Sequence, residues 1–169
     1  MLVTGALWAL ASLAAGAPTD DPLREAAATC VVSVTSPQAA PAEREHLPAF
    51  SATGIVGLSL ETLIRRTEGR GTLYLKLYNP RGNLYQTLTL PYVARPASAG
   101  PPPAPVPGQE QAAVPVVSGR LVRYRVEARL PVAGTTIMTD ALYGQWRVEP
   151  WLGGGNAACG PGTAFVIHD

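Results

Sequence analysis

The sequence predicts an all-β fold, an antiparallel β-sandwich of seven to eight strands, and three observations support this prediction. Several short segments alternate apolar and polar residues, which is the period of a strand with one buried face. Turn-forming residues separate these segments, and seventeen glycines and seventeen prolines in 169 residues disfavour long helices. About 150 residues follow an apolar N-terminal segment, enough for one domain with its own core.

The N-terminal segment 1–17 is uncharged, almost wholly apolar and ends in small residues, so it predicts a secretory signal peptide. Its apolar part is shorter than the roughly 20 residues that cross a membrane, so we expect no integral span once the leader is cleaved. The cleavage point is open, because a cut after Ala17 leaves Pro18 first and a cut after Ala14 avoids this. The alternatives are an uncleaved anchor, and a misassigned start or a buried strand. We therefore expect a secreted or periplasmic protein, with residues 18–29 as a spacer before a single domain, 30–169.

Cys30 and Cys159 are the only cysteines and lie near the two ends of the expected domain. In an oxidising compartment such a pair predicts a disulfide bond, and two unpaired thiols are the alternative. The abundance of Arg, Ala, Pro and Gly is typical of a GC-rich bacterial genome.

Segment 30–35 is rich in β-branched residues and predicts the first strand. Segment 36–48 holds three prolines and predicts a loop. Apolar residues then alternate from Val56 to Ile64, which predicts a second strand, with a helix over 58–66 as the competing interpretation.

Segment 72–90 predicts a β-hairpin around residues 79–82. This Asn-Pro-Arg-Gly run has the chemistry of a type I turn closed by a glycine bulge. The strand pairs expected from this turn are Leu77 with Leu84, Leu75 with Gln86 and Leu73 with Leu88. One face of the hairpin would then be apolar and the other would carry aromatic and polar side chains: Tyr74, Lys76, Tyr78, Asn83, Tyr85 and Thr87.

The rest of the chain continues the same pattern. Six prolines lie in segment 94–113, which predicts a long proline-rich loop, with a PxxP ligand segment as the alternative. Segment 131–139 predicts a turn and a short strand, and 153–162 a glycine-rich loop that holds Cys159. The remaining predicted strands are 121–130, 144–152 and 163–167.

Few residues suit catalysis. His46 lies in the proline-rich loop 36–48, His168 is the penultimate residue, and no serine stands in a Gly-x-Ser-x-Gly elbow. Alternation places the three strand carboxylates on solvent faces, which argues against a glycosidase pair: Glu61, Glu127 and Glu149. No metal-ligand spacing or phosphate loop is present, so we expect no enzyme, no metal and no cofactor. The formal net charge of +1 gives no basis for nucleic-acid binding.

Two surfaces are candidate binding sites. The first is the outer face of the hairpin, with Tyr74, Tyr78 and Tyr85 beside Lys76, where aromatic rings could stack on sugars or bury in a partner protein. The second is a row of cations on one strand that could hold an anionic glycan, and a charge-protected edge strand is its alternative. This row comprises Arg120, Arg123, Arg125 and Arg129.

The strand Gly144-x-Trp146-x-Val148 and the Tyr-Asn-Pro-Arg-Gly-Asn hairpin at 78–83 resemble those of bacterial secreted immunoglobulin-like and fibronectin III-like domains. The resemblance extends over 53–167 and implies an immunoglobulin-like β-sandwich in which Trp146 plugs the core. The core residues expected from this resemblance and from alternation are Leu75, Leu77, Tyr124, Val126, Trp146 and Val148.

The expected function is a non-enzymatic β-sandwich module for protein interaction, adhesion or scaffolding. The expected partner is an unknown protein or a cell-envelope glycan. The alternatives are a carbohydrate-binding module that uses Tyr74, Tyr78 and Tyr85, and an enzyme of uncharacterised activity.

Overall fold

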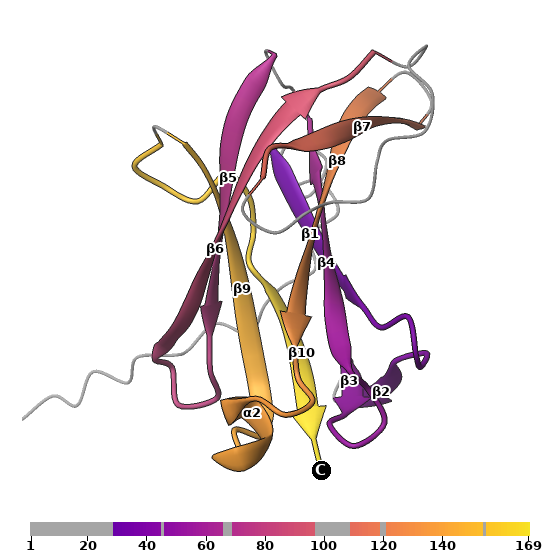
Figure 1. Ribbon diagram of the computed structural model, residues 1–169, viewed down its shortest axis with the longest axis vertical. Helices are drawn as coiled ribbons and strands as arrows, with labels where there is room; N and C mark the ends of the chain where they lie inside the picture. The colour runs from indigo at the N-terminus through magenta and orange to yellow at the C-terminus, as the bar shows by residue number, and fades with distance from the viewer. Residues whose placement is uncertain (1–28, 45, 66–68, 97–108, 119–120, 154) are drawn as a thin grey trace, which may run out of the picture.

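The computed structural model describes residues 29–44, 46–65, 69–96, 109–118, 121–153 and 155–169. The described part is all-β, as predicted, with ten strands and one short helix (Figure 1). The expected leader 1–17, nearly all of the spacer 18–29 and the middle of the proline-rich segment lie outside the described residues. The strands are β1 Cys30–Thr35, β2 Ala42–Arg44, β3 Leu47–Ser51, β4 Gly57–Ile64, β5 Arg70–Tyr78, β6 Leu84–Ala94, β7 Gln111–Ser118, β8 Leu121–Pro131, β9 Gly144–Leu152 and β10 Thr163–His168, and the helix is α2 Thr136–Thr139.

The ten strands form one mixed sheet in the order β1-β4-β8-β7-β6-β5-β9-β10-β3-β2. Neighbouring strands are antiparallel except at β6–β7 and β10–β3, which are parallel. The sheet curls until β1 contacts β9 and β10, so that it is nearly closed into a barrel. The predictions of seven to eight strands and of purely antiparallel pairing were therefore wrong, whereas the all-β class is confirmed.

Strand β7 joins the two halves of the curled sheet. Residues 111–113 pair with β6, and residues 114–118 pair with β8. The predicted loop 94–113 is therefore too long at its C-terminal end, because Gln111 already pairs with Tyr92 of β6. Among the described strands, segment 114–118 pairs along one edge only, with β8. Pro115 is tolerated there because it has no N–H to donate and its nitrogen can lie on the unpaired edge.

Two other elements differ from the sequence predictions. The expected loop 36–48 contains β2 and the start of β3, which pairs in parallel with β10. The expected turn and strand 131–139 contains α2, whose N-cap Thr135 accepts a hydrogen bond from the N–H of Ile137 at 3.3 Å. At the other end of α2 the N–H of Leu142 donates to the carbonyl of Ile137 at 2.9 Å, and Ala141 adopts a φ of 47°. This is the left-handed helix ending that usually carries glycine.

The hairpin β5–β6 forms around the predicted turn, but its register differs from the prediction. The N–H of Gly82 donates to the carbonyl of Asn79 at 2.9 Å, and Gly82 has a φ of 78°, as a type I turn with a glycine bulge requires. A second bulge follows at Leu77/Tyr78, so that Leu77 pairs with Gln86. Beyond it Leu75 pairs with Leu88 and Leu73 with Leu90.

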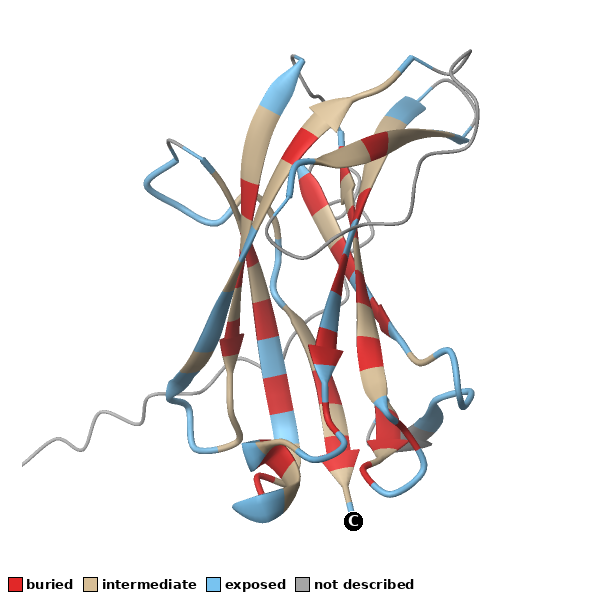
Figure 2. Ribbon diagram, in the orientation of Figure 1, coloured by how far each residue is buried: buried red, intermediate tan, exposed pale blue. Residues whose placement is uncertain are grey.

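The core lies between the two halves of the sheet, and buried residues alternate along the strands (Figure 2). Trp146 is fully buried near the start of β9, and its indole N–H donates to the carbonyl of Leu142 at 3.0 Å. Its ring stacks on Phe165 with the centroids 6.3 Å apart. The predicted core is confirmed for Leu75, Leu77, Val126, Trp146 and Val148, and Tyr124 packs against it partly buried.

The disulfide between Cys30 and Cys159 is present and lies at the seam of the curled sheet, by which we mean the place where β1 meets β9 and β10. It joins β1 to the loop 153–162 with a Cα–Cα distance of 5.3 Å. Beside it the N–H of Cys30 donates to the carbonyl of Cys159 at 3.0 Å, and the hydroxyl of Thr163 donates to the carbonyl of Val32 at 2.7 Å. A Cβ on Gly160 would collide with the carbonyl of Cys30, so the loop can approach β1 this closely only with glycine there.

Among the described residues no helix has the length and apolar character needed to cross a membrane.

Candidate functional site

Six side chains form a continuous surface on the outer side of β5 and β9. Leu73, Leu75 and Leu77 point into the core, so the alternate residues of β5 face outward. On β9 the same alternation turns residues 147, 149 and 151 outward. The cross-strand pairs of this surface, which we call the aromatic face, are Tyr74 with Trp151, Lys76 with Glu149 and Tyr78 with Arg147.

Cations cover two aromatic rings of the aromatic face. The Nζ of Lys76 lies 3.5 Å from the centroid of the Trp151 ring. The Cζ of Arg147 lies 4.8 Å from the centroid of the Tyr78 ring, and its guanidinium also pairs with Glu149 at 3.1 Å. Cations at these distances are attracted by the electron-rich ring face. The long side chains are therefore held flat against the sheet, and the rings remain half-buried.

The phenol of Tyr78 has a raised pKa. The main cause is desolvation by burial, to which the negative charge of Glu149 and a hydrogen bond with it add, while Arg147 acts in the opposite direction. Tyr78 therefore keeps its proton and donates its one O–H to the carboxylate of Glu149.

Tyr85 does not belong to the aromatic face, contrary to the prediction. The bulge at Leu77/Tyr78 places Tyr85 and Gln86 together opposite Leu77, so Tyr85 turns toward the core. Its ring meets Trp146 edge to face at 5.1 Å, and its hydroxyl lies 2.8 Å from that of Thr136. The residue opposite Lys76 on β6 is Thr87. The structure thus brings Tyr74, Lys76 and Tyr78 together without Tyr85.

Trp151 was missed at the sequence level, although a signal for it existed. Alternation from Trp146 and Val148 already turned residues 147 and 149 outward, and the same step reaches Trp151. Its position beside Tyr74 depends on the pairing of β5 with β9, which are far apart in the sequence. Such a non-local pairing leaves no mark on the local pattern.

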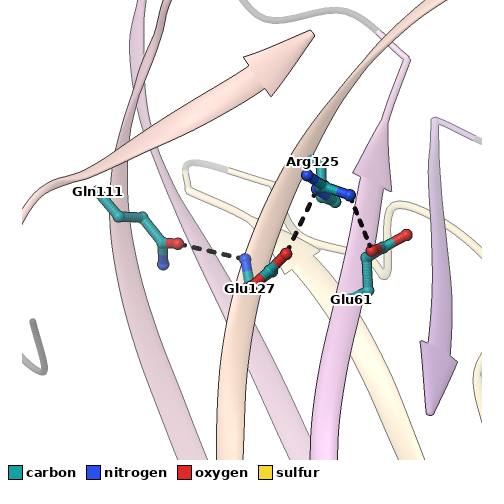
Figure 3. A network of polar contacts seen from close by, with 4 residues as sticks. All are labelled: Glu61, Gln111, Arg125 and Glu127. Atoms are coloured by element: carbon teal, nitrogen blue, oxygen red, sulfur yellow. Dashed lines mark hydrogen bonds and ion pairs between the residues drawn. The ribbon is translucent and has the colours of Figure 1, made fainter. Parts of the chain in front are cut away.

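The arginine row of β8 is only partly available for an anion. Arg120 lies outside the described residues. Arg125 pairs with Glu61 at 3.6 Å and with Glu127 at 3.4 Å, and the backbone N–H of Glu127 donates to the side-chain carbonyl of Gln111 at 3.2 Å (Figure 3). Arg125 thus separates two carboxylates that stand directly opposite each other on β4 and β8. Arg123 and Arg129 face the same side and have no ion pair within the described part of the chain.

A hollow of about 460 Å³ lies next to this network on the outer side of β1, β4 and β8. Its floor comes from the outward side chains of β4 and β8, and its walls come from the β1–β2 loop and the β3–β4 loop. The polar lining residues are Thr35, Ser36, Gln38, Ser59, Glu61, Glu127 and Arg129, and the others are Pro37, Val56, Gly57, Leu58, Leu130 and Pro131.

The two histidines lie apart from both surfaces. His46 adopts a φ of 64° immediately before β3. The Nδ1 of His168 lies 2.7 Å from the carbonyl oxygen of Asp169. Over the described ranges no three His, Cys, Asp or Glu side chains are grouped so that they could hold a metal ion.

Comparison with known proteins finds no match: no family model, no curated protein and no solved structure is similar to this chain.

Proposed function

We propose that this chain is a secreted or periplasmic, non-enzymatic binding module, and that the aromatic face is its protein-binding surface. The observation that carries the proposal is the aromatic face itself, where Trp, Tyr and Arg stand together on two rigid neighbouring strands. These three residue types dominate the binding energy of protein interfaces. The side chains are already ordered by their mutual contacts, so binding would cost little further side-chain entropy.

A protein partner explains this surface better than a sugar does. Carbohydrate stacking needs an open aromatic face, and Lys76 already lies against the ring of Trp151 at 3.5 Å. A sugar would have to displace that cation and also lose the contact of Arg147 with Tyr78. A protein surface can instead pack against the assembled rings and pair with the charges of Lys76, Arg147 and Glu149. Carbohydrate binding through Tyr74 and Tyr78 is the second candidate.

We infer further that the fold is a variant of the immunoglobulin-like class. Support comes from the all-β architecture and from Trp146, which is fully buried on a strand that begins with Gly144. The parallel pairs β6–β7 and β10–β3 are departures from the expected antiparallel sandwich.

Photo-crosslinking in the cells that make the chain tests the protein-binding proposal. A photoreactive phenylalanine analogue at Tyr74 should form a discrete protein adduct, and the same analogue at Thr53, an exposed residue of the β3–β4 loop, should not. Lys76→Glu should reduce the adduct because it reverses the charge on the aromatic face. Arg123→Glu is the matched control on the outer side of β8 and should leave the adduct unchanged.

Two results would contradict this proposal. One is equal adduct formation at Tyr74 and Thr53, which indicates non-specific labelling. The other is glycan-array binding that disappears in Tyr74→Ala while no protein adduct forms, which would favour the carbohydrate-binding function instead.

A further inference from the structure

We propose that the hollow beside the Glu61–Arg125–Glu127 network is a second binding site, for a short saccharide that carries a carboxylate. This site is on the opposite half of the curled sheet from the aromatic face and does not depend on its function. Its volume of about 460 Å³ falls within the range of about 300–1,000 Å³ that is common for ligand sites.

Two carboxylates, Glu61 and Glu127, line the hollow. Glu61 and Glu127 stand opposite each other, and their repulsion is relieved by Arg125 between them (Figure 3). Arg125 contacts only Oε2 of Glu61 and Oε1 of Glu127. Within the described residues the remaining oxygen of each carboxylate has no ion pair, so both can accept hydrogen bonds from ligand hydroxyls.

Arg129 is the cation that lines the hollow. Arg129 lies two residues beyond Glu127 on the same face of β8, opposite Ser59 of β4, and lines the hollow. It has no ion pair among the described residues, whereas Arg125 uses its charge on two acids. The charged side chains that line the hollow are Glu61, Glu127 and Arg129, and Arg125 lies beside it and holds both carboxylates. The four formal charges sum to zero, and the positive end of this group is at Arg129. A planar carboxylate is the group that a guanidinium fork binds best.

Uncharged polar side chains also line the hollow. Hydroxyls of Thr35, Ser36 and Ser59 and the side chain of Gln38 offer both donors and acceptors around the hollow. The hydroxyl of Ser36 already donates to the side-chain carbonyl of Gln38 at 3.1 Å, which orients the Gln38 amide group. A ligand that also presents many groups able to donate and accept matches such a lining, and sugars have this property.

The apolar parts of the lining fit the same ligand class. Pro37, Val56 and Pro131 border the hollow, and Val56 is 65% exposed. The C–H faces of a sugar ring can cover such aliphatic groups and remove them from water. Among the described residues no aromatic ring lines the hollow, so we expect an affinity in the millimolar range.

Titration followed by NMR of the ¹⁵N-labelled protein tests the site with two probes, the disaccharide of galacturonic acid and the neutral disaccharide of galactose. The acidic probe should shift the amide signals of Ser36, Gln38 and Ser59 in a saturable manner. The neutral probe should bind at least about tenfold more weakly, because it cannot form the charge-assisted contact with Arg129.

Two variants locate the binding. Arg129→Gln removes the charge from an exposed side chain and should weaken the acidic probe to the level of the neutral one. Arg123→Gln, on the same face of β8 and outside the hollow, should have no effect. The proposal is overturned if the acidic probe causes no saturable shifts, if both probes bind equally, or if Arg123→Gln weakens binding as much as Arg129→Gln does. The comparison of the two probes uses the unaltered protein, so it stands even if a variant fails to fold.

Discussion

Reduction of the disulfide between Cys30 and Cys159 should lower the free energy of unfolding by about 5 kcal/mol. The two cysteines are 129 residues apart in sequence, so the bond restricts a loop that comprises most of the described chain. For a loop of this length the chain-entropy model gives a loss of about 16–17 cal/mol/K in the unfolded state, which is about 5 kcal/mol at 25 °C. With about 2–4 °C per kcal/mol for a chain of this size, the melting temperature should fall by about 10–20 °C.

Urea unfolding followed by tryptophan fluorescence measures this difference, with and without a phosphine reductant. A slope of about 2 kcal/mol/M would convert the loss into a midpoint shift of about 2.5 M. The slope itself should become steeper on reduction, because the unfolded chain without the crosslink exposes more surface. A Cys30→Ala/Cys159→Ala variant is the control, and the reductant should not change its unfolding curve.

In the chain-entropy model the disulfide acts mainly on the unfolded state. The hydrogen bonds of Cys30 with Cys159 and of Thr163 with Val32 also hold the seam, so the reduced native protein should keep its sheet. A loss below about 1 kcal/mol would refute the loop-entropy calculation. Amide shifts throughout β1, β9 and β10 on reduction would instead show that the bond maintains the native arrangement.

Two further predictions concern single residues. Ala141→Gly should stabilise the protein by about 1 kcal/mol, because Ala141 has a φ of 47° in the helix ending that favours glycine. The control is Ala133→Gly, at an exposed position without a positive φ, which should give no gain in the same urea assay. Burial raises the pKa of Tyr92 above the ordinary value of 10.0, so the unfolded chain loses this proton at a lower pH than the folded protein does. The contribution of the protonated Tyr92 to stability is therefore complete below pH 10 and declines above it. Tyr92→Phe should therefore flatten the loss of stability above about pH 10, and an unchanged pH profile would contradict this assignment.

Local patterns predicted those elements whose period and boundaries are set by nearby residues. Alternation located β4 and β8, and the Asn-Pro-Arg-Gly run located the turn of the β5–β6 hairpin. The same reasoning missed the bulge at Leu77/Tyr78, because a bulge is selected by packing across strands and the sequence on either side can accommodate both registers. The position of Tyr85 was wrong for this reason alone.

The missed strands have a different cause. β2 and β3 lie among prolines and are only three and five residues long, so the signals for a loop outweigh their weak strand pattern. β7 follows the proline-rich segment and is held by neighbours on both halves of the sheet. For the aromatic face, the pattern indicated Tyr74, Lys76 and Tyr78 but not Trp151, since it says nothing about which strand lies next to β5. The hollow likewise depends on loops that come together only in the folded chain.

The parallel pairing of β6 with β7 has a consequence for the connection between them. Ala94 pairs with Ala113, and Tyr92 with Gln111, so the chain leaves β6 and has to return only two residues, or about 7 Å, along the strand direction. An extended segment as long as residues 95–110 reaches about 50 Å, several times what this return requires. Closure of the fold therefore sets only a minimum length for the connection, and the domain can accept insertions or deletions there while both strands keep their register.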